Sequence, residues 1–383
     1  MPDPAEPAPT TTGPTTSTST SGIRAAAVVV PCRPLQPTLE FFTRRLGLRV
    51  DAIHPADSPT VADLSGHGLA VRLEPGEGEQ PGAGLRLRVR CDDPAAVAGG
   101  EAVLVAPNGT TVELVAANPG LVLPPERPEL VVTHVREGEA WGTGRAGMQY
   151  RELIPGRQGG RFIGSHIRIP TAGPVPDYVH HHQVRFQMIY CHKGWVRVAY
   201  EDQGEPVLME AGDCVLQPPH IRHRVLESGD GLEVIELGCP AEHETLADHT
   251  MTLPTGALLP ERDYGGQRFV FHDASMAEWR AWRADGFEAR DIGIGAATDG
   301  LAGVRVARPA GSDRTPFVAH DAEFVFGFVL AGTCTLAVEG RAAETMEEGD
   351  TFVVPRGVAH ALTGCSADFE LLDVTLPEVV VPA

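Results

Sequence analysis

The sequence lacks the features that mark secreted or membrane-bound proteins. None of its seven cysteines forms a CxxC pair, and their odd number and wide scatter fit free thiols better than a disulfide framework. No apolar run approaches the ~20 residues that span a bilayer, and no basic segment followed by an apolar one stands near the N-terminus. We therefore expect a soluble, cytoplasmic protein with no membrane partner.

Positive charge is also scarce. The 31 Lys and Arg residues are outnumbered by 51 Asp and Glu, which gives a formal net charge of −20 and a pI near 5.1. Such a surface repels phosphate backbones and anionic lipids, so we expect no nucleic-acid partner. A small-molecule substrate is the partner that fits best.

The composition changes along the chain, and 383 residues allow two or three domains. Residues 1–22 are mostly Pro, Thr and Ser, so they bury too little apolar surface to offset the entropy of ordering, and we predict a disordered tail. Residues 148–245 and 288–377 consist of short strand-like runs broken by Gly and Pro, as in a barrel. The connector 246–287 between them is predicted to be loop, with a short helix over 274–286.

Residues 23–118 predict a small α+β domain. The run AAAVVV at 25–30 predicts a strand, and Leu39, Phe42 and Leu46 then share one face of a helix. Asn108-Gly109 between two apolar runs predicts a tight hairpin. This strand and helix order, with the closing PNGTTVELV, resembles the glyoxalase or vicinal-oxygen-chelate family.

That resemblance implies a metal ligand on the first strand and a Glu near the end of the last strand. Of these two positions, only the second is occupied by a ligand residue, Glu113; the first strand, AAAVVV, contains no side chain that binds a metal. We therefore expect Glu113 to be a solvated strand residue and this domain to have no metal chemistry.

The two β-rich regions repeat one pattern. Both run strand, Gly, strand, turn, Gly-Asp, strand, Pro and a closing His, which indicates an internal duplication. In the first copy, His180 and His182 are followed after four residues by Gln187 and after six more by Gly194. Its closing segment, GDCVLQPPHIRH, ends at His223.

These spacings resemble the two motifs of the cupin superfamily, whose members are jelly-roll β-barrels. The resemblance implies a mainly β protein with two tandem cupin barrels after the glyoxalase-like domain, and metal ligands at His180, His182, Gln187 and His223. Homodimers are common among cupins, so a homodimer is compatible with it.

The same ligands follow in part from strand geometry. Residues two apart in a strand point to one face, so His180 and His182 can both aim inward while His181 points away. Three imidazoles and one oxygen suit a single divalent transition metal, with Fe(II) expected and Mn(II), Ni(II), Zn(II) or Cu(II) as alternatives. The amide of Gln187 is neutral where the family usually has Glu, so it either coordinates weakly or hydrogen-bonds a bound water, and the centre should favour an anionic, chelating molecule.

The second copy keeps the barrel motif but lacks two of the four ligands. Val318 and Val325 replace a His and the carboxylate, whereas His320 and His360 remain. We therefore expect a structural barrel with an apolar pocket.

Bicupins with one such site resemble metal-dependent dioxygenases, which implies an oxidoreductase acting on a small anionic, aromatic or enolisable substrate. An oxygen-independent isomerase, lyase or decarboxylase is the first alternative, and a non-enzymatic small-molecule-binding protein is the second. Candidate catalytic residues are Arg168, which could bind a carboxylate, and Tyr178 and His166, which could act as acid or base.

Overall fold

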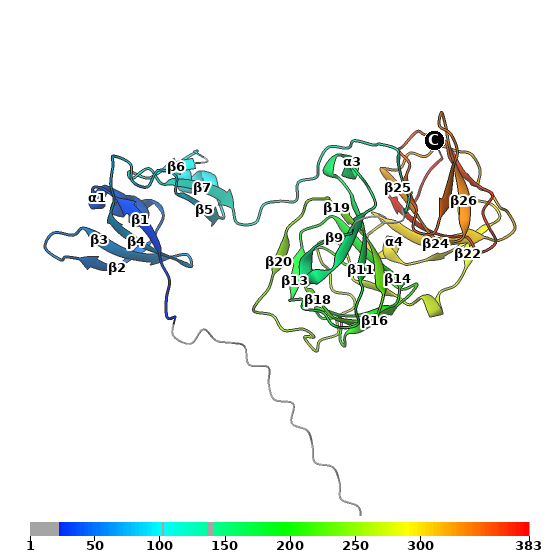
Figure 1. Ribbon diagram of the computed structural model, residues 1–383, viewed down its shortest axis with the longest axis horizontal. Helices are drawn as coiled ribbons and strands as arrows, with labels where there is room; N and C mark the ends of the chain where they lie inside the picture. Colours follow the sequence, from blue (N-terminus) through cyan, green and yellow to red (C-terminus); the bar gives the residue numbers. More distant parts are fainter. Residues whose placement is uncertain (1–22, 102, 136–140, 383) are drawn as a thin grey trace, which may run out of the picture. The chain divides into compact units, whose positions relative to one another are not determined.

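The computed structural model describes residues 23–101, 103–135 and 141–382, so the tail predicted over 1–22 lies outside the described residues. The chain divides into two compact units, Met1–Gly120 and Leu121–Ala383 (Figure 1). The described chain is mainly β, as predicted. Within the described residues, no helix has the length and apolar character needed to cross a bilayer.

The first unit contains two small mixed sheets. In one, the strand order is β1-β4-β3-β2 with β1 parallel to β4; in the other, the order is β5-β7-β6 with β5 parallel to β7. The predicted helix packs Phe42 and Leu46 into the core, and the predicted hairpin at Asn108-Gly109 joins β6 to β7. The elements are β1 (Val28–Cys32), α1 (Leu35–Glu40), the π-helix η1 (Phe41–Arg45), β2 (Arg49–His54), β3 (Val61–Gly66), β4 (Leu69–Pro75), β5 (Arg86–Cys91), α2 (Pro94–Ala98), β6 (Val103–Val105) and β7 (Thr111–Ala116).

The second unit begins with a barrel of two antiparallel sheets. The larger sheet has the order β21-β17-β14-β19-β11-β10-β9, and the smaller has β16-β15-β18-β13-β20, with β12 beside β18. Its elements are β9 (Gly142–Thr143), η2 (Arg145–Gly147), β10 (Gln149–Glu152), α3 (Arg157–Gly160), β11 (Ile163–Ile169), β12 (Gly173–Pro174), β13 (His180–His182), β14 (Phe186–Lys193), β15 (Trp195–Tyr200), β16 (Val207–Glu210), β17 (Cys214–Leu216), β18 (His223–Ser228), β19 (Leu232–Cys239), β20 (Thr245–Ala247) and β21 (Val270–His272).

A second barrel of the same design follows. Its larger sheet has the order β22-β23-β24-β30-β25-β28-β8 and its smaller sheet β27-β26-β29. The elements are β8 (Val131–Thr133), η3 (Ala274–Met276), β22 (Arg280–Ala281), β23 (Phe287–Asp291), α4 (Ile294–Ala297), β24 (Gly303–Pro309), β25 (Phe324–Ala331), β26 (Thr333–Val338), β27 (Glu344–Glu347), β28 (Thr351–Val353), β29 (His360–Thr363) and β30 (Glu370–Leu376).

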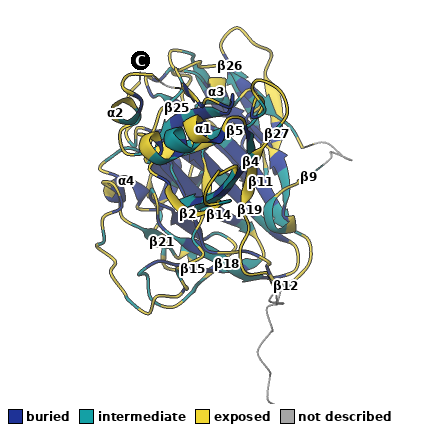
Figure 2. Ribbon diagram, turned by 90° about the vertical axis from the view of Figure 1, so that its left-hand side faces the viewer, coloured by how far each residue is buried: buried dark blue, intermediate teal, exposed yellow. Residues whose placement is uncertain are grey.

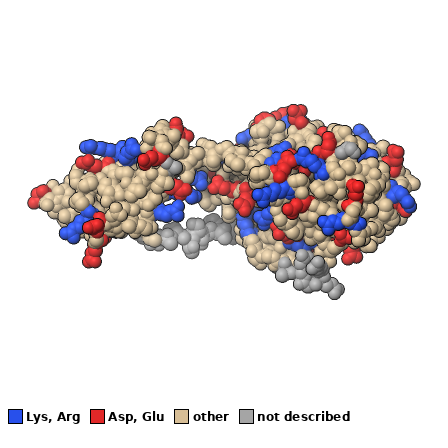
Figure 3. All heavy atoms as spheres, turned by 90° about the horizontal axis from the view of Figure 1, so that it is seen from above, with Lys and Arg blue, Asp and Glu red and all other residues tan. Residues whose placement is uncertain are grey.

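The two barrels share strands and a core. β8 precedes the first barrel in the chain but pairs with β28 of the second, while β21 pairs back onto β17 of the first. One apolar cluster includes residues of both larger sheets, and the ring of Phe162 stacks on that of Phe324 at 4.0 Å. Buried residues follow the strands and exposed residues the connecting loops (Figure 2). Acidic and basic side chains are interspersed on the face drawn in Figure 3.

The predicted helix over 274–286 was wrong. The segment forms a three-residue 3-10 turn, Ala274–Met276, and then the strand β22, which pairs with β23. Both tryptophans carry an arginine on the ring: Arg308, from β24, lies 3.7 Å over Trp279, and the neighbouring Arg283 lies 4.3 Å over Trp282. Strand pairing and these contacts outweigh the local helix preference.

Candidate metal centre

Three buried histidines converge inside the first barrel. His180 and His182 lie at the ends of β13, and His223 begins β18 directly opposite His180 in the antiparallel pair. The ring centroids are 4.2 Å apart for His180 and His223, 5.2 Å for His180 and His182, and 5.3 Å for His182 and His223. One nitrogen from each ring lies within 4.8 Å of the others, so this triad can bind a metal ion.

Hydrogen bonds on the far side of each ring orient the triad. Nδ1 of His180 donates to the carbonyl of Tyr178 at 2.8 Å, and Nδ1 of His223 donates to the carbonyl of Ile221 at 3.1 Å. Nδ1 of His182 lies 3.2 Å from the hydroxyl of Thr245. A carbonyl can only accept, so the Nε2 atoms of His180 and His223 carry free lone pairs. Nε2 of His180 is buried and has no hydrogen-bond partner among the described residues, as expected for a ligand atom.

The surroundings also keep the rings neutral. Burial lowers the pKa of His182 to about 2, with the neighbouring His180 adding to the effect. Burial likewise lowers the pKa of His223 and of His180, to which Arg145 contributes by charge repulsion. Neutral imidazole is the form that binds a metal.

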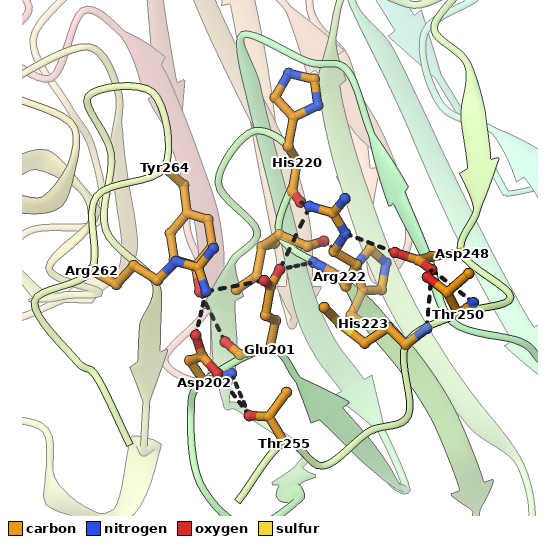
Figure 4. A network of polar contacts seen from close by, with 12 residues as sticks. Glu201, Asp202, His220, Arg222, His223, Asp248, Thr250, Thr255, Arg262 and Tyr264 are labelled. Atoms are coloured by element: carbon orange, nitrogen blue, oxygen red, sulfur yellow. Dashed lines mark hydrogen bonds and ion pairs between the residues drawn. The ribbon is translucent and has the colours of Figure 1, made fainter. Parts of the chain in front are cut away.

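The loop that leads into His223 is tied down by a polar network (Figure 4). The backbone amide of Arg222 donates to Glu201 at 3.2 Å, and its guanidinium pairs with Asp248 at 3.3 Å. Glu201 is also paired with Arg262 at 3.0 Å. These contacts fix the start of β18, and therefore the direction of the His223 ring.

The fourth predicted ligand, Gln187, faces the same space from β14. Its side chain is only 1% exposed, and its amide nitrogen donates to Oε1 of Glu236 at 2.6 Å. That bond leaves the amide oxygen of Gln187 available as a ligand atom. The sequence analysis missed Glu236, although Leu232, Val234 and Glu236 alternate along β19 and all line the cavity.

Beside the triad is a cavity of about 290 Å³. Its only charged lining residues among those described are Arg145 and Glu236, and Arg145 forms a buried ion pair with Asp177. Most of the wall is apolar, with a few polar groups such as Gln217 and Thr245. The apolar lining residues are Met148, Ile163, Ile167, Ile169, Ile189, Val196, Val198, Met209, Val225, Leu232 and Val234.

The three candidate catalytic residues are not among the residues that line this cavity. Along β11, Ile163, Ser165, Ile167 and Ile169 face the cavity, so His166 and Arg168 face the other way. Arg168 lies 4.1 Å over the ring of Trp141, and His166 is hydrogen-bonded to Glu233 at 2.9 Å. Tyr178 is 42% exposed; its ring packs edge-on to that of His180 at 5.8 Å, and its backbone carbonyl accepts from the same histidine.

In the second barrel, the four positions equivalent to the ligands surround a cavity of their own. Val318, His320, Val325 and His360 all line it. Within the described ranges, the triad of the first barrel is the only group of three or more His, Cys, Asp or Glu side chains that lie close enough together to hold a metal ion.

The comparisons with known proteins agree with this architecture. The family described as "Cupin domain" matches residues 166–236 and 304–375, so the chain contains two tandem cupin domains. No curated protein matches the sequence. The solved salicylate 1,2-dioxygenase of Pseudaminobacter salicylatoxidans is similar with a TM-score of 0.51 at 15% identity, covering 68% of this chain and 90% of that one. Its adduct with gentisate gives 0.50 at 16% identity, covering 68% and 87%.

Proposed function

We propose that the first barrel is a mononuclear metal centre of an oxidoreductase that cleaves or oxygenates a small aromatic or enolisable anion. The observation that carries the proposal is the convergence of three neutral, buried imidazoles beside a mainly apolar cavity. His180, His182 and His223 would hold Fe(II), or another divalent transition metal, with the amide oxygen of Gln187 as a fourth ligand. When bound, the metal would act as a Lewis acid for two substrate oxygens and supply the redox chemistry for O2.

The neutral ligand set supports an anionic substrate. Three neutral imidazoles and an amide leave the full +2 charge at the centre, which favours a chelating carboxylate, phenolate or enolate. A cavity of about 290 Å³ is roughly twice the ~150 Å³ that holds benzene, so one ring with small substituents fits. Isoleucine and valine side chains would pack on the ring faces and exclude water.

Glu236 is the residue best placed to move a proton. One carboxylate oxygen, Oε1, accepts from Gln187, and the structure shows no partner for Oε2 among the described residues. We propose that Oε2 takes the proton from a substrate hydroxyl and that Gln187 holds the carboxylate in place. The fold similarity to a salicylate 1,2-dioxygenase is consistent with such a substrate.

Glu236 also supports a second candidate function. A carboxylate beside a divalent metal can act as acid or base in an oxygen-independent isomerase, lyase or decarboxylase. Turnover under strict anaerobiosis distinguishes the two candidates, because only the oxygenase requires O2.

We also propose that residues 23–118 form a glyoxalase-like domain without a metal. The β1-β4-β3-β2 order with a parallel β1 and β4 supports this proposal. Glu113 faces solvent and pairs with Arg88 at 3.0 Å, so it is occupied by a surface ion pair. The proposed cupin domains span 148–245 and 288–377, joined by 246–287.

The first experiment is metal analysis by plasma mass spectrometry of protein purified without chelators or nickel resin. The test variants are His180→Ala and His223→Ala, and His181→Ala is the matched control because its ring lies 5.6 Å from His220 rather than in the triad. We expect near-stoichiometric metal in the parent and the control, and its loss in both test variants. Oxygen consumption with salicylate, gentisate and catechol then follows; metal equally bound by the test variants would contradict the proposal.

A further inference from the structure

The second barrel has kept an open interior although it has lost two ligand positions. Its cavity, of about 320 Å³, is as large as the one beside the triad. Protein interiors are normally filled by interdigitating side chains, and small barrels are closed in this way. A barrel that served only as packing would be expected to fill this space.

The cavity wall is built mainly from apolar side chains. Val325, Phe352, Leu362 and Leu371 are all buried and line it. The C-terminal segment adds Val380 and Pro382 to the wall. The backbone N–H of Asp321 donates a hydrogen bond of 3.2 Å to the carbonyl oxygen of Val381. The interior is therefore concave and mostly apolar, as small-molecule sites usually are.

Its charges are balanced within the wall. Arg283 forms a two-pronged ion pair with Asp373, in which Nη2 and Oδ1 are 2.6 Å apart and Asp373 is 1% exposed. Burial lowers the pKa of His360 to about 4 and also lowers that of His320, so both rings are neutral near pH 7. An uncharged molecule matches this lining better than an anion does.

Three buried polar atoms of wall residues have no hydrogen-bond partner among the described residues: Nδ1 of His320, Nδ1 of His360 and Nε1 of Trp282. His320 is 3% exposed, and its Nε2–H donates to the carbonyl of Val354 at 3.1 Å, which leaves Nδ1 as an acceptor with no hydrogen bond among the described residues. The indole Nε1–H of Trp282 is a donor that likewise lacks a partner there. A buried polar atom without a hydrogen-bond partner costs about 1 to 3 kcal/mol, so a molecule that hydrogen-bonded both Nδ1 of His320 and Nε1 of Trp282 would gain affinity.

We propose that the second barrel binds an uncharged aromatic molecule of one or two rings that carries a hydroxyl group. A hydroxyl both accepts, as the indole N–H of Trp282 requires, and donates, as Nδ1 of His320 requires. The cavity has about twice the ~150 Å³ that accommodates benzene, which sets the ring count. This site is separate from the metal centre and does not depend on the function proposed for it.

The test uses the full chain, dialysed against chelator, in calorimetric titrations with three probes: 2-naphthol, naphthalene and 2-naphthoate. We expect 2-naphthol to bind as a single molecule per chain. Naphthalene should bind about tenfold more weakly, because it leaves Nδ1 of His320 and Nε1 of Trp282 unsatisfied. The anion 2-naphthoate should bind more weakly than 2-naphthol.

Two filling variants locate the site. Val325→Phe should abolish 2-naphthol binding, whereas Val198→Phe, which fills the first cavity, should not. Trp282→Phe keeps an aromatic ring but removes the N–H, so it should weaken the binding of 2-naphthol and leave that of naphthalene unchanged. Trp282 is partly exposed, so this variant carries the test if Val325→Phe does not fold.

Three results would overturn the proposal. One is failure of all three probes to bind up to their solubility limits. Another is loss of binding in Val198→Phe but not in Val325→Phe, which would place the probe in the first barrel. The third is tightest binding of 2-naphthoate, which would show that the site selects an anion.

Discussion

Replacing His180 with leucine should separate metal binding from the stability of the metal-free barrel. In the metal-free protein, Nε2 of His180 is a buried acceptor without a partner among the described residues, which costs about 1 to 3 kcal/mol. His180→Leu removes that atom and also removes the bond from Nδ1 to the Tyr178 carbonyl, worth about 0.5 to 1.5 kcal/mol. Leucine fills most of the imidazole volume, so we expect metal-free His180→Leu to be as stable as the parent, or more stable by about 1 kcal/mol.

The effect of metal should be the opposite. A metal that binds only the folded state at a free concentration 100-fold above its Kd stabilises the parent by about 2.7 kcal/mol. His180→Leu loses one of three imidazoles and should show almost none of this gain.

The assay is thermal unfolding of both proteins with chelator and with a titration of Fe(II), Mn(II) or Zn(II), the first under anaerobic conditions. We expect the two melting temperatures to be similar in chelator and to diverge as metal is added. Equal metal-induced shifts would refute the triad as the centre. A loss of 3 kcal/mol or more in the metal-free variant would refute the argument that the unpaired nitrogen is a cost in that state.

Three further predictions concern pH, the ion pair of the second barrel and the fourth ligand. The pKa of His360 falls from about 6.5 in the unfolded chain to about 4 in the fold, so the unfolded state binds more protons and stability falls as the pH drops from 6.5 toward 4. Between pH 7 and pH 5, the melting temperature of His360→Gln should therefore fall less than that of the parent. The control is His249→Gln, at an exposed position, whose melting temperature should follow that of the parent. Arg283→Met should lower the free energy of unfolding by roughly 2 to 4 kcal/mol, because it leaves the Asp373 carboxylate buried without its partner. Adding Asp373→Leu should recover most of this loss, as measured by urea unfolding. A double variant no more stable than Arg283→Met would contradict the prediction. Gln187→Leu should speed metal loss to a competing chelator on the order of tenfold, because it removes the fourth ligand while the three imidazoles remain. Unchanged chelator kinetics would place Gln187 outside the coordination sphere.

The meeting of three histidines in the first barrel was predictable from the sequence, because it depends on local periodicity and on strand pairing. His180 and His182 meet because they are two apart in a strand, and His223 lies opposite His180 because the strands pair antiparallel. The candidates Arg168 and His166 fell outside the cavity for the same reason. Their neighbours Ile163, Ser165, Ile167 and Ile169 face the cavity, and which face of a strand points inward cannot be decided from alternation alone when both faces are buried.

Long-range pairing explains what the sequence could not show. β8 and β21 each join the sheet of the other half of the repeat, and nothing local to VVT or VFH specifies such a partner. The helix expected over 274–286 is replaced by a short hairpin of β22 with β23, and Trp279 is covered by Arg308, a residue that lies far along the chain.

The two barrels carry an acidic residue at equivalent places, but its hydrogen-bond partner differs between them. In the first barrel Glu236 pairs in register with Ile189, and in the second Asp373 pairs in register with Gly327, at equivalent places in the repeat. Where Gln187 occupies the ligand position, its amide nitrogen donates to the carboxylate, and its amide oxygen takes no part in that bond. Where Val325 occupies that position, no such donor exists, and the carboxylate is neutralised by Arg283 instead. With valine at both positions 318 and 325, the acid of the second barrel closes an ion pair with Arg283 instead of accepting from an amide. This difference agrees with the anionic substrate proposed for the first barrel and the uncharged molecule proposed for the second.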